Sequence, residues 1–247
     1  MIRAAATLLL AAAAVAPSAA LAQSAPITAT ADPTRRALGY ELAKLLNPEA
    51  PVMAALEAAF GDSLPEMLLA DPEMKEMEAR YPGIVKAMAD AMRPILLRYL
   101  RESMPELWDR MAVVYSELSE ADLRAVIGFY RSPTGTRIIE LMTSDAQLGP
   151  MLQELMADED DTTTGQELSA AARQAATAAV GKMTQAQIAE AARFAATPAG
   201  RRAVALQPRM AAVMADWSNR PSPEVQAELE AVLIPVVERF TGMKVDP

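Results

Sequence analysis

Methionine is the residue whose number and spacing in this sequence could support chemistry. The chain of 247 residues contains 16 methionines. Pairs separated by three or four residues place both thioethers on one face of a helix. Thioethers are soft ligands that suit monovalent copper, and they also pack well against varied apolar partners. We interpret the pairs as core-packing residues, with a partner-binding groove and a copper site as alternatives. The pairs are Met74/Met77, Met88/Met92 and Met210/Met214.

The other residue types that usually catalyse reactions or bind metals are absent or lack a supporting motif. The sequence has no histidine and no cysteine, which excludes an imidazole base, a thiol nucleophile, a disulfide and the usual zinc and haem sites. It has no nucleophile-elbow, phosphate-loop or dinucleotide-binding glycine motif. Acidic pairs at helical spacing, such as Glu73/Glu76 and Glu102/Glu106, are typical of a solvated helix face. We therefore predict no catalytic residue, no cofactor, no metal site and no enzymatic activity.

The charge is acidic overall and unevenly distributed. With 23 lysines and arginines against 32 acidic residues, the net charge is −9, which argues against binding to nucleic acid or to an anionic membrane. Residues 32–161 contain 24 acidic and 13 basic residues, whereas residues 162–222 contain 3 acidic and 7 basic residues. The simplest explanation is that the basic segment docks against the acidic one or is simply solvated; an anion-binding face is the alternative.

The placement of proline indicates where helices begin and predicts an all-α fold. Six of the 18 prolines follow a residue that caps helix N-termini well, and proline at the first helical position loses no hydrogen bond. Strand-like alternation of apolar and polar residues is nearly absent. Residues 84–118 form a long helical pattern, in which we expect a kink or break near Pro94 and Pro105. The six predicted helix starts are Asp32-Pro33, Asn47-Pro48, Asp71-Pro72, Ser132-Pro133, Thr197-Pro198 and Ser222-Pro223.

Composition divides the chain after its first 22 residues into four regions. Residues 23–83 should form short helices, because proline or glycine recurs there. Residues 84–157 and 167–247 should form a first and a second helical unit. Between them, residues 158–166 combine four acidic residues with three threonines and one glycine. This composition is typical of a linker, and a cation site is the alternative.

Residues 1–22 have the composition of a secretory signal peptide. Arg3 supplies the positive start, residues 4–16 are apolar and uncharged, and Ala20-Leu21-Ala22 is a small-x-small cleavage motif. The apolar run is shorter than the roughly 20 residues that a spanning helix needs, so an uncleaved membrane anchor is the less favoured alternative. We expect cleavage between Ala22 and Gln23, a periplasmic or secreted mature protein, and no transmembrane segment in that mature protein.

A shift of 65 residues aligns two segments of the sequence, 115–142 and 180–207. The matching positions gather where one helix would end, the chain would turn a corner, and the next helix would begin. We therefore predict a multi-helix bundle built around two degenerate helix–corner–helix repeats. The corner residues are Phe129, Ser132, Pro133, Gly135 and Arg137 in the first unit, and Phe194, Thr197, Pro198, Gly200 and Arg202 in the second.

Each corner has a local physical explanation. Ser119 and Thr184 begin the preceding helix with capping-box spacing. The serine or threonine of each corner should cap the next helix, and the glycine at its third position should let another part of the chain approach closely. Arg137 and Arg202 lie near the same helix start, where backbone N–H groups and a guanidinium could hold an anion. Pairing of each arginine with a carboxylate is the interpretation that we prefer.

The first unit resembles a known family. Leu118-Ser119-Glu120-Ala121-Asp122-Leu123, followed by Phe129-Tyr130-Arg131-Ser132-Pro133-Thr134-Gly135, is similar to the signature of exported bacterial proteins grouped as domain of unknown function 2059 (DUF2059). The resemblance covers about residues 85–150 and extends to the second unit only as a degenerate copy, in which Ala195 replaces the tyrosine and Thr197 the serine. It implies an exported helical protein and no particular activity.

Together, these observations favour a non-enzymatic protein of the cell envelope. Paired helical units, apolar methionine and leucine side chains, and the lack of catalytic groups predict a surface that binds envelope proteins or peptides. The alternative is a small-molecule, anion or metal-ion binding protein of the periplasm, with the corners or the methionine pairs as its sites.

Overall fold

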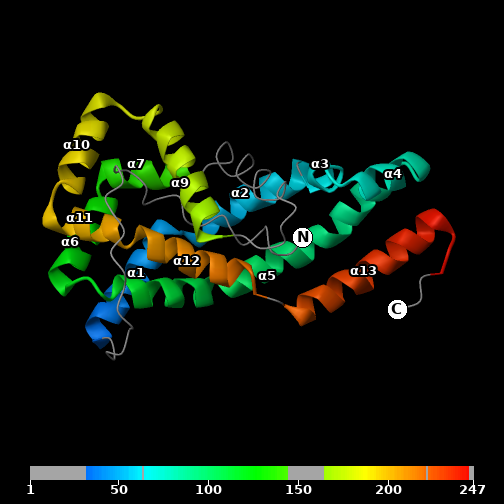
Figure 1. Cartoon of the computed structure of the whole chain (residues 1–247), viewed down its shortest axis with the longest axis horizontal. Helices are drawn as coiled ribbons and strands as arrows, with labels where there is room; N and C mark the ends of the chain where they lie inside the picture. Colours follow the sequence, from blue (N-terminus) through cyan, green and yellow to red (C-terminus); the bar gives the residue numbers. More distant parts are fainter. Residues whose placement is uncertain (1–31, 63, 144–163, 221, 245–247) are drawn as a thin grey trace.

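The computed structural model is organised around one long helix, α5 (Ile84–Tyr115), which runs along the molecule (Figure 1). Every regular element among the described residues is an α-helix, which confirms the predicted all-α, multi-helix fold. The predicted signal peptide, its cleavage site and residues 158–163 of the predicted linker lie outside the described residues. The structure describes residues 32–62, 64–143, 164–220 and 222–244.

Four short helices precede α5 and pack against it, as the frequent prolines and glycines of this region predict. None of them exceeds 14 residues, and α1 also packs against α6 (Glu120–Tyr130). The four helices are α1 (Pro33–Leu46), α2 (Glu49–Asp62), α3 (Leu64–Leu68) and α4 (Pro72–Arg80).

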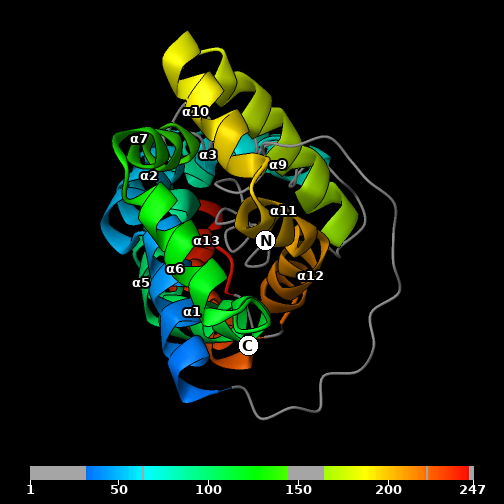
Figure 2. The same ribbon diagram turned by 90° about the vertical axis from the view of Figure 1, so that its left-hand side faces the viewer.

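The helices that follow α5 first gather at one end of the molecule, beside α1, and then return along α5 (Figure 1). Helices α6, α7, α10 and α11 lie together at one end (Figure 2). Helix α9 packs against α12, and both α12 and α13 pack against α5. The bounds are α7 (Pro133–Met142), α9 (Gly165–Val180), α10 (Gln185–Ala195), α11 (Pro198–Ala205), α12 (Gln207–Ser218) and α13 (Pro223–Thr241).

All six predicted helix starts are confirmed to within one residue, but two of the predicted caps are wrong: Ser222 makes no side-chain capping hydrogen bond to α13, and Asn47 has a different role. The side chains of Asp32, Asp71, Ser132 and Thr197 accept hydrogen bonds from the first turn of their helices. Asn47 instead ends α1: its amide donates to the Ala43 carbonyl at 3.0 Å and contacts the Met111 sulfur at 3.5 Å. The Asn47 carbonyl also accepts from the Trp108 indole at 3.1 Å, so this residue joins α1 to α5.

Of the kink or break expected at the prolines of α5, the break does not occur, because this helix continues through Pro94 and Pro105 for 32 residues; the kink stays a prediction. Both prolines lie on the exposed side of the helix. Carbonyl groups that lose their helical partner there can bond to water instead. The opposite side is held by buried residues such as Leu96 and Leu107, so packing overrides the local preference for a break.

The core is continuous across the predicted boundary between the two helical units. One cluster of buried side chains includes residues of α1, α5, α6, α7, α9, α12 and α13. Because the core does not divide at this boundary, the division into four regions stays a prediction. Gly165 and Gln166, the last residues of the predicted linker, are the first residues of α9. Among the described residues, no helix combines the length and apolarity needed to cross a membrane.

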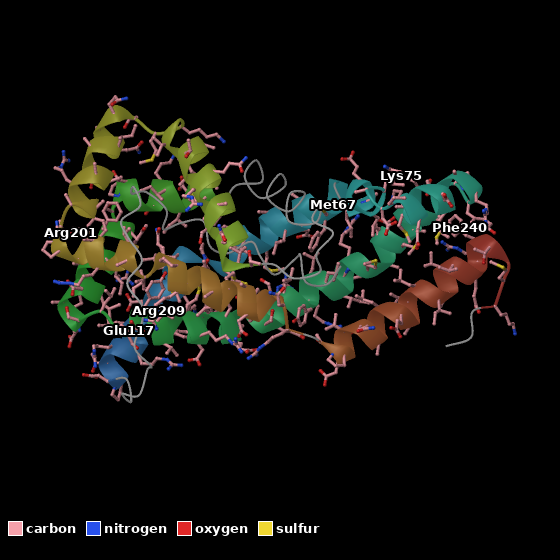
Figure 3. The ribbon with its side chains drawn as sticks, in the orientation of Figure 1. Met67, Lys75, Glu117, Arg201, Arg209 and Phe240 are labelled. Carbon is pink, nitrogen blue, oxygen red and sulfur yellow. The ribbon has the colours of Figure 1, made fainter. Side chains whose placement is uncertain are left out.

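The basic and acidic segments meet as the charge distribution predicts. Arg209 on α12 pairs with Glu117, which lies between α5 and α6 (Figure 3). Arg220 pairs with Glu106 on α5. These ion pairs are partly exposed, so each contributes little stability, but together they align α12 with α5.

Candidate functional site: an apolar pocket between two helical corners

The two predicted corners adopt the same local geometry. The Gly135 N–H donates to the Ser132 hydroxyl at 3.2 Å, and the Gly200 N–H donates to the Thr197 hydroxyl at 3.0 Å. A Cβ on either glycine would come closer than 3.0 Å to the backbone at the end of the preceding helix. The missing side chain therefore permits the tight corner, which confirms the close approach predicted at these positions.

The helices before the corners also begin alike. Ser119 accepts a hydrogen bond from the Asp122 N–H at 3.1 Å, and Thr184 accepts one from the Gln187 N–H at 3.3 Å. The Gln187 side-chain oxygen in turn accepts a hydrogen bond from the Thr184 N–H at 2.9 Å, which completes a capping box. These matching caps do not by themselves establish the repeat, which stays a prediction from the sequence.

The two corners pack against each other through equivalent residues. The Phe129 and Phe194 rings stack with their centroids 4.0 Å apart and an interplanar angle of 2°. Helix α6 contacts α11, and α7 contacts α10. The first contact includes an ion pair between Asp122 and Arg202 at 3.3 Å, and the second includes a hydrogen bond from Thr134 to Glu190. The corners thus form one assembly with the stacked rings at its centre.

Beside the stacked rings lies a pocket of about 50 Å³. Its walls come from α1, α5, α6, α7, α10, α11 and α12, so it exists only when both corners are in place. Phe129, Phe194, Val204 and Met210 are among the lining residues, and none of the lining residues is charged. An apolar concave site with few polar groups is the usual form of a small binding pocket.

Three polar side chains that line the pocket, those of Gln207, Tyr115 and Tyr130, have unusual surroundings. The Gln207 amide nitrogen is buried and has no hydrogen-bond partner in the part of the chain that the structure describes. Burial raises the pKa of the Tyr115 phenol well above its ordinary value. Burial also raises the pKa of Tyr130, another lining residue, to about 12. Both phenols are therefore neutral at physiological pH, and the pocket offers neutral hydrogen-bonding groups only.

The second unit differs from the first at a position that matters for the pocket. Ala195 occupies the place after Phe194 that Tyr130 occupies after Phe129, and both Ala195 and Tyr130 line the pocket. The first unit therefore contributes a phenol ring to the pocket wall at this position, whereas the second unit contributes only a methyl group. This difference leaves room beside the stacked rings.

The remaining predicted site residues have structural roles. Arg137 pairs with Glu140 at 3.1 Å and Arg202 pairs with Asp122, so both guanidiniums face carboxylates, as preferred in the sequence interpretation. Pro133 and Pro198 occupy the first positions of α7 and α11. Within the described residues, no group of three or more acidic side chains is arranged to hold a metal ion.

The methionine pairs are mostly packing residues. Met88, Met92 and Met214 are buried in the core, whereas Met74 and Met77 are partly buried and pack against it. Of the paired methionines, only Met210 lines the pocket. The core-packing interpretation is therefore confirmed for most of them, and the partner-binding groove stays an alternative prediction.

Sequence reasoning found part of this site and missed the rest. It found both phenylalanines, both glycines and the departure at Ala195. It missed Gln207 and Tyr115, because a single glutamine or tyrosine near a helix end carries no local signal of a pocket. Their importance depends on α5 and α12 packing beside the corners.

Comparison with known proteins supports the family assignment for the first unit. Residues 105–158 match the family model described as "Uncharacterized protein conserved in bacteria (DUF2059)". The predicted resemblance to DUF2059 is confirmed. The DUF2059 match includes α6 and α7, whereas α10 and α11 lie outside it. No curated protein and no solved structure matches the chain.

Proposed function

We propose that this protein is an exported, non-enzymatic helical protein that binds proteins or peptides of the cell envelope. The observation that supports binding is the apolar pocket between the corners, which is lined by Gln207, a residue whose buried amide nitrogen has no hydrogen-bond partner among the described residues. A buried polar group of this kind costs stability unless a ligand or water completes its hydrogen bond. The pocket is small, so it suits one side chain of a larger partner better than a whole cofactor.

The geometry of the pocket supports access by such a partner. Phe194, Ala195, Val204 and Gln207 are only partly buried, so α10, α11 and the start of α12 form the accessible side of the pocket. These residues lie on helices that support one another through the stacked rings. A largely preformed site loses little conformational freedom when a partner binds.

Binding can be tested with the mature chain, residues 23–247, and a set of unfolded envelope proteins. We expect the protein to bind these clients or suppress their aggregation at micromolar concentration. Ala203→Leu adds volume at a residue that lines the pocket and should weaken the effect. Ala205→Leu adds the same volume at an exposed position of the same helix and should not. The absence of both binding and suppression would contradict the proposal.

The proposal of export is supported by the sequence of residues 1–22 and has a separate test. Expression of the full chain in a bacterial host, followed by N-terminal sequencing of the protein in the periplasm or medium, should give a sequence beginning at Gln23. A protein that keeps Met1 and stays inside the cell would contradict export without affecting the binding proposal.

A further inference from the structure

We infer that the pocket binds one aliphatic residue of an uncharged peptide segment, with a main-chain carbonyl of that segment accepting a hydrogen bond from the Gln207 amide. Ala195 then determines the size of the side chain that fits. This inference rests on the proposed peptide-binding function and specifies its ligand.

The buried Gln207 amide nitrogen defines the polar part of the ligand. An N–H donor that is buried without a partner gains a hydrogen bond only from a group with an accessible acceptor atom, which in a peptide is most often a carbonyl oxygen. A peptide carbonyl supplies this oxygen immediately next to an aliphatic side chain. The apolar walls formed by Phe129, Phe194 and Met210 would contact that side chain at the same time.

The absence of charge in the pocket defines the ligand further. No charged residue is among those that line it, and the lining phenols are neutral at physiological pH. Moving a carboxylate, a phosphate or an ammonium group into such surroundings would cost far more than one hydrogen bond returns. The ligand is therefore a neutral segment from the interior of a peptide chain rather than a charged terminus or headgroup.

The size of the pocket selects an aliphatic side chain. A cavity of roughly 150 Å³ in another protein takes up benzene, whereas this pocket measures about 50 Å³. An aromatic ring would have to displace the stacked phenylalanines. A leucine or valine side chain needs less room than a ring but more than the pocket offers as it stands, so the flexible Met210 side chain must move to admit it.

Ala195 is the residue that keeps the pocket open on the side of the second unit. Its counterpart in the first unit, Tyr130, already contributes its ring to the wall. The substitution Ala195→Tyr would restore the residue found in the first corner and place a second ring beside the first. This change should close the pocket, whereas Ala192→Tyr introduces the same ring at an exposed position of α10 and provides the control.

The experiment is a titration monitored by the methyl signals of isotope-labelled methionines. The probes are N-acetylated, C-amidated pentapeptides of glycine with leucine, phenylalanine or aspartate at the centre. We expect the leucine peptide to shift the Met210 signal, while the signal of Met214, which is buried and does not line the pocket, stays in place. The phenylalanine and aspartate peptides should bind at least about tenfold more weakly, because the ring does not fit the pocket and the carboxylate would be buried without a counter-charge. Tenfold weaker binding corresponds to about 1.4 kcal/mol.

Variants then test the two residues that the inference assigns. Gln207→Leu should weaken the binding of the leucine peptide by about tenfold, which is the usual effect of losing one hydrogen bond. Ala195→Tyr should abolish the Met210 shift, and Ala192→Tyr should preserve it. Circular dichroism of each variant checks its fold, and the peptide selectivity of the unsubstituted protein tests the ligand class without any variant.

The outcomes distinguish this inference from the proposed function. If no envelope client and no peptide binds, both fail. If clients bind but the leucine peptide leaves Met210 unchanged, the inference is overturned and the binding function stands. Equal affinity for the aspartate peptide, or unchanged affinity of Gln207→Leu, would also overturn it. Tighter binding of a short aliphatic ester than of the leucine peptide would assign the pocket to a small molecule instead.

Discussion

At the residue scale, the two corner glycines make the clearest prediction. A methyl group on Gly135 or Gly200 would collide with backbone atoms of the preceding helix, which cannot move without opening the corner. We expect Gly135→Ala and Gly200→Ala each to lower the free energy of unfolding by about 2–4 kcal/mol. Urea denaturation followed by circular dichroism measures this loss.

Gly128 provides the matched control for these substitutions. It lies in α6, and a Cβ there would have no neighbour within 4 Å. Because alanine favours helix more than glycine, Gly128→Ala should raise the free energy of unfolding by about 0.5–1 kcal/mol. Similar effects at Gly128 and Gly135 would show that the tight corner is not what constrains Gly135.

The buried tyrosines predict a loss of stability in alkali. The pKa of Tyr130 is about 12 in the folded protein and 10.0 for an ordinary tyrosine. Above pH 10 the unfolded chain therefore ionises this phenol while the folded protein keeps it protonated, which favours unfolding. We expect Tyr130 to account for about 2–3 kcal/mol of the stability lost between pH 10 and pH 12, and Tyr130→Phe to remove that part of the dependence while the part due to Tyr115 remains. Constant stability of the unsubstituted protein up to pH 12 would contradict this assignment.

At the element scale, most helix starts could be predicted from sequence because they depend on a few adjacent residues. The serine and threonine of the corners accept bonds from within their own helices, so local rules suffice. Asn47-Pro48 has the same sequence pattern of a capping residue followed by proline. The Asn47 amide nevertheless donates to the Ala43 carbonyl in α1 and contacts Met111 on α5. No local rule reveals that contact, because the two residues meet only after α1 packs against α5.

The prolines of α5 give a prediction at the same scale. Each occupies an exposed interior position of the helix, where proline costs about 3 kcal/mol relative to alanine. Proline also restricts the unfolded chain, which offsets up to about 1 kcal/mol of that cost. Pro94→Ala and Pro105→Ala should therefore each stabilise the protein by about 2–3 kcal/mol in urea denaturation.

Pro133→Ala tests whether the interior position of Pro94 and Pro105 explains the stabilisation expected when they are replaced by alanine. Pro133 is the first residue of α7, where alanine regains no hydrogen bond. We expect this substitution to be neutral or slightly destabilising. Stabilisation at Pro133 equal to that at Pro94 would contradict the explanation based on the helix interior.

At the scale of the whole molecule, the pocket could not have been predicted from the sequence. Its walls combine residues from α1 to α12, and the stacking of Phe129 on Phe194 sets their spacing. Charge did predict one aspect of this arrangement, because arginines of the basic segment pair with Glu106 and Glu117 of the acidic segment. Such pairs indicate which segments meet, but they do not specify the angles that leave a cavity.

The continuous core predicts that the two helical units unfold together. The chain has two tryptophans: Trp108 on α5 belongs to the first unit and Trp217 on α12 to the second. Both are buried in the same core cluster, and α12 and α13 pack directly against α5. A single cooperative transition is therefore expected, although the sequence alone suggests two units joined by a linker.

Single-tryptophan variants measure this cooperativity directly. In Trp217→Phe the fluorescence reports on the first unit, and in Trp108→Phe it reports on the second. We expect the urea midpoint from fluorescence to equal the midpoint from circular dichroism within each variant. Trp108→Phe should be less stable by about 1 kcal/mol, since its indole loses the hydrogen bond to the Asn47 carbonyl, but both of its probes should shift together. If Trp217 fluorescence changed at lower urea than the helical signal, the second unit would open separately, and the pocket would be lost before the rest of the fold.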